Sequence, residues 1–168
     1  KGASFRFVIN NLNNVWNGRS STVAKEETIS FKSPDQKNWT AFETEWLEGN
    51  RLAFELTMDS ETMYIARVEP YRVSDLDHLL EEIQSWDQGT ITAMGKTVQD
   101  RDLEIIDIGN AQAPYSIFIR ARAHPWEPGG NWVVQGMIYE LMQNPDKTQK
   151  YLQRFSLHIL PMANKDGV

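Results

Sequence analysis

Residues 115–142, YSIFIRARAHPWEPGGNWVVQGMIYELM, decide the fold of the second half of this chain. Residues 115–123 carry aromatic and β-branched side chains, a pattern typical of a strand. In residues 131–142 the apolar side chains recur at helical spacing and form one stripe, which predicts a helix. Residues 155–162 are a nearly continuous apolar run, as expected of a strand covered on both faces. Together these segments predict a βαβ unit.

A helix is also expected upstream, in VSDLDHLLEEIQSW at residues 73–86, with Ser74 as its N-cap. Residues 103–109 predict a further strand, and residues 145–155 predict a short helix before the last strand. The expected order is therefore helix, strand, strand, helix, strand. This order predicts the beginning of an α/β domain, with helices packed on a mixed and mostly parallel sheet. The residues expected on the buried face of the first helix are Leu76, Leu79, Leu80 and Ile83.

The first 73 residues have a different pattern, with short candidate strands separated by polar clusters and no helical periodicity. In SFRFVIN, at residues 4–10, Phe5, Phe7 and Ile9 alternate with other side chains, which predicts a half-buried strand. We therefore expect a small antiparallel β-sandwich over residues 1–73 and the α/β domain over residues 74–168.

Composition limits the kinds of partner. The chain has 168 residues, is 40% hydrophobic and carries a net charge of −6, which favours a folded protein and argues against nucleic acid or an anionic membrane as partner. Cysteine is absent, so a metal site would need His, Asp or Glu. No signal peptide is visible, which favours a cytoplasmic location. Because the sequence begins at Lys1 rather than Met, a periplasmic or secreted location stays open if an N-terminal signal was removed.

The turn HPWEPGGNW, residues 124–132, combines a possible metal site with unusual backbone chemistry. His124 and Glu127 are three positions apart, so both side chains can reach one zinc ion if the backbone curls between them. Each is followed by a proline, which biases it towards extended geometry. We expect the glycines at 129 and 130 to reverse the chain and Asn131 to cap the following helix. A packed turn with no ligand is the alternative reading.

This turn resembles the metal-binding motif of the zinc carboxypeptidase family, closest to its cytosolic-carboxypeptidase-like branch. That motif usually reads His-Pro-Gly-Glu, then a small polar residue, a tryptophan and a helix. EPYRVSDLDHLLEEI, QDRDLEIIDIG and NKDGV are similar to further segments of the branch and occur in the same order. The resemblance covers nearly the whole chain. It implies a phosphorylase/hydrolase-like catalytic domain preceded by a β-sandwich.

By this resemblance, His124 and Glu127 are two of the three ligands of one Zn²⁺ per catalytic domain. The third ligand, the groups that bind the substrate's terminal carboxylate and the glutamate acting as general base are all expected beyond Val168. No catalytic residue is therefore expected within the chain. We expect the chain to be incomplete and inactive by itself.

Three positions depart from the branch. Trp126 stands where glycine is usual, Pro128 where Ser or Thr is usual, and Lys165 where proline is usual. Trp126, Asn131 and Trp132 are the candidate substrate-pocket residues, although Trp126 could instead pack beneath the loop. Lys165 is expected to be tolerated on a surface loop.

Other ionisable residues have more ordinary interpretations. His158 lies within a predicted strand and is expected to be a satisfied core or edge residue rather than a ligand. Arg120 and Arg122 lie on the strand that enters the turn. We expect them to pair with acidic neighbours, with a contact to substrate as the alternative.

The leading functional hypothesis is a zinc-dependent carboxypeptidase that removes C-terminal residues from peptides or proteins. The rival is a non-catalytic module that binds a peptide or protein through the β-sandwich and carries a degenerate or truncated peptidase domain. Hydrolysis of an amide in a non-peptide substrate is a third possibility.

Overall fold

The chain forms two compact units, Lys1–Pro70 and Tyr71–Val168. The computed structural model describes residues 2–21 and 29–168. The division falls between Pro70 and Tyr71, close to the expected boundary between residues 73 and 74. Each unit has its own sheets and is described by itself.

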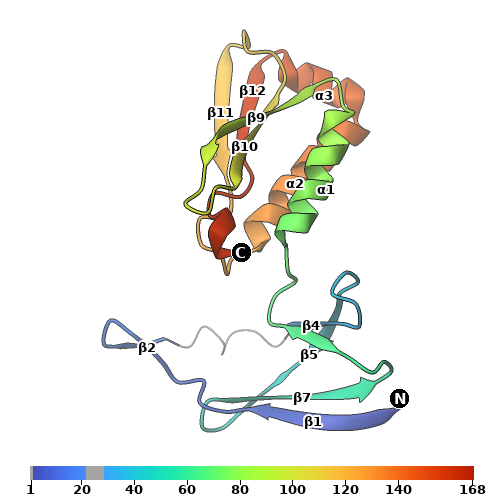
Figure 1. The fold of residues 1–168 in the computed structure, drawn as a ribbon, viewed down its shortest axis with the longest axis vertical. Helices are drawn as coiled ribbons and strands as arrows, with labels where there is room; N and C mark the ends of the chain where they lie inside the picture. The colour runs from blue at the N-terminus through green and yellow to red at the C-terminus, as the bar shows by residue number, and fades with distance from the viewer. Residues whose placement is uncertain (1, 22–28) are drawn as a thin grey trace. The chain divides into compact units, whose positions relative to one another are not determined.

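The N-terminal unit is built from antiparallel strands (Figure 1). One sheet has the order β1-β7-β6, another has the order β5-β4-β8, and β2 pairs with β3. The two three-stranded sheets meet at aromatic side chains, since the rings of Phe42 and Phe54 are 5.4 Å apart in an edge-on contact. The expected antiparallel β architecture is confirmed. The strands are β1 (Ala3–Ile9), β2 (Asn14–Trp16), β3 (Arg19–Ser21), β4 (Ile29–Ser33), β5 (Thr40–Glu43), β6 (Glu45–Leu47), β7 (Arg51–Met58) and β8 (Tyr64–Ala66).

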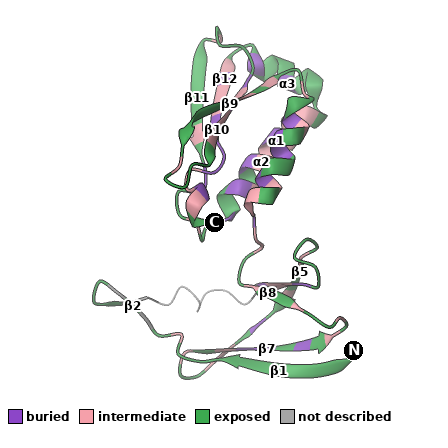
Figure 2. Ribbon diagram, viewed as in Figure 1, coloured by how far each residue is buried: buried purple, intermediate pink, exposed green. Residues whose placement is uncertain are grey.

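The burial expected for the first strand is wrong. β1 forms as predicted and pairs with β7, but all its residues are exposed. Phe5 is 50% exposed and Phe7 40% exposed. Figure 2 shows the ribbon of β1 in the colour of exposed residues. The core of this unit instead draws on β7, where Ala53, Phe54 and Leu56 are buried. Alternation in a sequence shows which side chains share a face, but it does not show whether that face is covered.

The C-terminal unit contains a four-stranded sheet of order β11-β12-β10-β9. Only β11 and β12 pair in parallel, while β10 is antiparallel to both β9 and β12. The mixed α/β fold is confirmed, but the expectation of a mostly parallel sheet is wrong. The sequence analysis also missed β9. The elements are α1 (Val73–Gln84), β9 (Gly89–Lys96), β10 (Asp102–Ile108), β11 (Tyr115–Arg120), α2 (Gly129–Gln143), α3 (Pro145–Leu152), β12 (Phe155–Leu160) and the 3-10 turn η2 (Lys165–Gly167).

Helix α1 begins at Val73, two residues earlier than a cap at Ser74 implies, and its N-cap is Arg72. The side chain of Asp75 accepts a hydrogen bond of 2.7 Å from the backbone N–H of Arg72. A carboxylate in the first turn thus satisfies the donor just before the helix. The predicted apolar face is confirmed, and its buried residues are Leu76, Leu79, Leu80 and Ile83.

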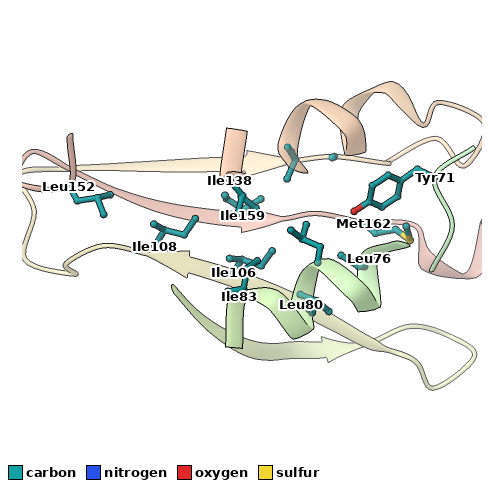
Figure 3. Packing of buried hydrophobic residues seen from close by; sticks show 13 residues of the cluster. Tyr71, Leu76, Leu80, Ile83, Ile106, Ile108, Ile138, Leu152, Ile159 and Met162 are labelled. Atoms are coloured by element: carbon teal, nitrogen blue, oxygen red, sulfur yellow. The ribbon is translucent and has the colours of Figure 1, made fainter. Parts of the chain in front are cut away.

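The core of this unit lies between the sheet and the two longer helices (Figure 3). Ile106 and Ile108 of β10, Ile159 of β12 and Ile138 of α2 are at most 1% exposed. The predicted βαβ unit is also present, since β11 and β12 are parallel neighbours and α2 and α3 connect them. The carboxyl ends of both strands consequently lie at the same edge of the sheet. The two segments that follow them form the candidate site.

Candidate metal centre

Two motifs far apart in the sequence meet at this edge of the sheet. The backbone N–H groups of Ala163 and Asn164 donate to the carbonyl oxygens of Ala121 and Arg122, each at 3.0 Å. Further along, Gly167 packs so closely on Pro125 that an added Cβ would lie 2.8 Å from the proline Cβ. The segment after β12 therefore supports the turn after β11. In open α/β sheets, binding sites lie beyond the carboxyl ends of the strands.

His124 and Glu127 point their side chains at each other. Nδ1 of His124 lies 2.9 Å from Oε2 of Glu127. The backbone supports this geometry, because the N–H of Glu127 donates to the carbonyl of His124 at 3.2 Å and closes a tight turn. Both side chains are 60% exposed, so the pair is open to solvent. A nitrogen donor and a carboxylate donor are thus brought together as the sequence predicts.

The donor set fits one edge of a zinc coordination sphere. Two ligand atoms at about 2.1 Å from a tetrahedral zinc ion are about 3.4 Å apart. The observed 2.9 Å between Nδ1 and Oε2 is typical of a direct hydrogen bond, and a shift of about half an ångström would admit the ion. In residues 2–21 and 29–168, no group of three or more His, Cys, Asp or Glu is placed to hold a metal.

Trp126 covers one face of the histidine. Its ring is parallel to that of His124, with an angle of 3° and a centroid distance of 5.2 Å. The indole is 70% exposed, so its other face is open to solvent. Trp126 therefore does not pack beneath the loop, which was the alternative interpretation of this residue. It is an exposed aromatic surface beside the candidate ligands.

The two other candidate pocket residues contact the protein core. Asn131 is 1% exposed, and its Nδ2 donates to the carbonyl of Pro161 at 2.8 Å. It is not an N-cap, because α2 begins at Gly129 with Pro128 at the cap position. Trp132 is partly buried, and its ring contacts Tyr71 edge-on at 4.8 Å. Their assignment to a substrate pocket stays a prediction.

The glycines expected to reverse the chain after β11 do not have that role. Gly129 and Gly130 are the first residues of α2, and neither has a positive φ. Arg122 does, with φ at +52°, and it lies directly before the turn. Its side chain is buried, and burial lowers the pKa of its guanidinium from the ordinary value. The expected acidic partner for Arg122 is wrong, since its hydrogen-bond acceptors are two backbone carbonyls and an amide oxygen.

Lys165 also differs from its prediction. It is 4% exposed rather than on the surface. Its Nζ donates to both carboxylate oxygens of Glu104, at 2.6 and 2.9 Å, and to the carbonyl of Asp102. The lysine that replaces the branch's proline therefore forms a buried ion pair with β10.

His158 is not placed near the turn's ligand pair. Its Nδ1 lies 2.6 Å from Oδ1 of Asp107, its register partner on β10. The expectation of a satisfied residue within the sheet is confirmed. Its proximity to Asp107 could not be predicted because strand register depends on the tertiary fold.

Similarity to known proteins identifies the family of this chain. A family model described as zinc carboxypeptidase matches residues 76–168, which is more than half of the chain. The chain belongs to the zinc carboxypeptidase family. This confirms the family expected from the turn, a family of metallopeptidases and thus of hydrolases.

Individual relatives agree with this family. Cytosolic carboxypeptidase 2 of Danio rerio is 26% identical over 125 residues, which are 68% of this chain and 17% of that protein. Two solved structures also match. A candidate carboxypeptidase A from Shewanella denitrificans OS-217 has a TM-score of 0.83 at 28% identity and covers 99% of this chain. A metallo-carboxypeptidase from Burkholderia cenocepacia has a TM-score of 0.74 at 26% identity and covers 83% of it.

The chain is much shorter than these zinc carboxypeptidase relatives. It spans 43% of the Shewanella chain and 38% of the Burkholderia chain. No helix in the described part of the chain is long and apolar enough to cross a membrane.

Proposed function

We propose that this protein is a zinc metallocarboxypeptidase that hydrolyses the last peptide bond of a peptide or protein. The observation that carries the proposal is the convergence of His124 Nδ1 and Glu127 Oε2 within 2.9 Å at the carboxyl end of β11. Family membership supports the same chemistry. In this proposal the N-terminal unit is the β-sandwich domain and the C-terminal unit is the first part of the catalytic domain.

In the proposed site, His124 and Glu127 hold the zinc ion and leave its remaining positions to groups outside residues 1–168. When bound, zinc supplies a Lewis acid and a water molecule of lowered pKa. The third ligand, the general base and the groups that bind the substrate's carboxylate belong to the rest of the protein. Trp126 borders the site with an exposed indole face that a substrate side chain can contact.

The cytosolic carboxypeptidases among the relatives support a peptide or protein C-terminus as substrate and a cytoplasmic location as parts of the same proposal. The net charge of −6 supports neither nucleic acid nor an anionic membrane as partner.

The test is zinc stoichiometry and peptide hydrolysis by the full-length protein and by its variant His124→Ala. We expect one zinc per wild-type molecule, and loss of both zinc and activity in the variant. His78→Ala is the matched control, because His78 is 69% exposed on α1 and should leave both unchanged. A wild-type protein that binds no zinc would favour the non-catalytic module instead. Cleavage of an amidated amino acid but of no peptide would favour the third possibility.

A further inference from the structure

Arg122 joins four parts of the C-terminal unit from a buried position. Its Nε donates to the carbonyl of Pro125 at 2.8 Å, inside the turn between His124 and Glu127. Its Nη1 donates to the carbonyl of Tyr71 and to Oδ1 of Asn131, both at 3.1 Å. Asn131 in turn donates to the carbonyl of Pro161, just after β12. One guanidinium therefore links the turn to the start of α1, to the first turn of α2 and, through Asn131, to the loop after β12.

Two features make Arg122 costly to keep at this position. It is 8% exposed, and no carboxylate in the described part of the chain pairs with it, so a positive charge is buried on neutral acceptors. Its backbone also has φ at +52°, a left-handed conformation that side chains with a Cβ disfavour. Backbone strain of this kind concentrates at functional sites, where the surrounding structure maintains it.

The position of the guanidinium shows which part of the structure it holds in place. Pro125 is the residue directly after His124, and its carbonyl accepts the hydrogen bond from Arg122 Nε. A guanidinium presents several N–H groups in a rigid plane, so it fixes this carbonyl relative to α2 and to Tyr71. Gly167 closes the turn from another direction, through its tight contact with Pro125. The turn is thereby held on two sides.

We propose that Arg122 is a positioning residue for zinc binding, which holds the backbone between His124 and Glu127 so that both ligands converge before the metal arrives. The inference rests on the proposed zinc site. The hydrogen bonds of the Arg122 side chain go to Pro125, Tyr71 and Asn131 rather than to either candidate ligand side chain, and in this proposal it acts through the carbonyl of Pro125. Groups that orient metal ligands from outside the coordination sphere typically contribute about 10- to 100-fold to metal affinity.

The decisive variant is Arg122→Gly in the full-length protein. Glycine adopts a positive φ without strain, so this change removes the guanidinium while keeping the backbone conformation accessible. We expect zinc affinity, measured by competition with a chelator, to fall on the order of tenfold or more. Arg122→Lys keeps the positive charge but not the planar guanidinium, and its loss of zinc affinity should be smaller than that of Arg122→Gly. Guanidinium ion at low millimolar concentration should partly restore the affinity of Arg122→Gly and not that of His124→Ala.

A separate readout distinguishes positioning from general stability. At saturating zinc, Arg122→Gly should lower kcat while KM stays within about twofold, because the proposal has the buried Arg122 act through the turn and not through a contact with substrate. Arg154→Gln is the matched control, since Arg154 is exposed and lies beside Tyr115 and Phe155, at the other end of the parallel strands. It should bind zinc as wild type does.

Each outcome decides one of the two proposals. If the wild-type protein binds no zinc, the proposed function fails and this inference with it. If the wild type binds zinc and Arg122→Gly binds it equally tightly, only the inference is overturned. If circular dichroism shows that Arg122→Gly does not fold, Arg122→Lys decides, and unchanged zinc affinity in that variant overturns the inference.

Discussion

Lys165 Nζ lies 2.6 Å from Oε1 and 2.9 Å from Oε2 of Glu104, with side-chain exposures of 6% and 15%. This pair connects η2 to β10 across 61 residues of sequence. Because η2 also carries Gly167, which packs on Pro125, the pair anchors the segment that supports the candidate zinc turn.

We predict that Lys165→Met destabilises the protein by about 3–5 kcal/mol, because it leaves the carboxylate of Glu104 buried without a partner. The double variant Glu104→Leu with Lys165→Met removes both charges and should recover most of that loss. Urea unfolding of the three proteins measures the effect. Lys147→Met is the control, since the Lys147–Glu140 pair is exposed and should contribute less than about 1 kcal/mol. A loss of stability below about 1 kcal/mol for Lys165→Met would contradict a structural role for the buried pair.

The contact between Gly167 and Pro125 gives a second prediction. A Cβ at residue 167 would lie 2.8 and 2.9 Å from two ring carbons of Pro125, so Gly167→Ala must shift either η2 or the candidate zinc turn at residues 124–132. We expect weaker zinc binding by a few-fold, measured by chelator competition.

Gly136→Ala is the matched control for this change. Gly136 is exposed in the middle of α2, and nothing lies within 4 Å of an added Cβ. Alanine should stabilise the protein there by about 0.5–1 kcal/mol, because glycine is unfavourable inside a helix. Zinc binding should not change. Equal zinc affinity in Gly167→Ala and wild type would show that the turn does not depend on η2.

The parallel rings of Trp126 and His124 predict an optical signal for zinc. Their centroids are 5.2 Å apart, so metal binding to the imidazole should change the environment of the indole. We expect zinc titration to alter tryptophan fluorescence in the wild type, and Trp126→Phe to lose most of this change while retaining zinc affinity. A full fluorescence change in Trp126→Phe would mean that other tryptophans report the binding.

A fourth prediction concerns residues 1–168 as an isolated polypeptide. No cluster of three metal-binding side chains occurs in the described residues, and the proposed general base is not among them. We expect this polypeptide to show no peptidase activity with zinc present, in an assay where the full-length protein is active. Turnover that a chelator abolishes would refute this expectation.

The sequence by itself determined most of the local elements of the C-terminal unit, although not β9, and it predicted the ligand pair in the turn. Helical spacing identified the buried face of α1, and continuous apolar character identified β12, because these patterns depend on the repeat of a single element. The spacing of His124 and Glu127 predicted that their side chains can meet, and Nδ1 and Oε2 do lie 2.9 Å apart. Their role as zinc ligands stays a prediction. The resemblance to zinc carboxypeptidases added the family, which the matched residues 76–168 confirm.

Only the tertiary structure decided which side chains are buried and what they contact. Lys165 and Arg122 belong to residue types that usually lie at the surface. Both are buried here, because partners from distant segments satisfy their donors. Phe5 and Phe7 belong to a residue type that is usually buried, yet β1 is exposed. The antiparallel register that pairs His158 with Asp107 is likewise absent from any local pattern. Burial and pairing depend on how separate elements pack, so no single stretch of the sequence contains them.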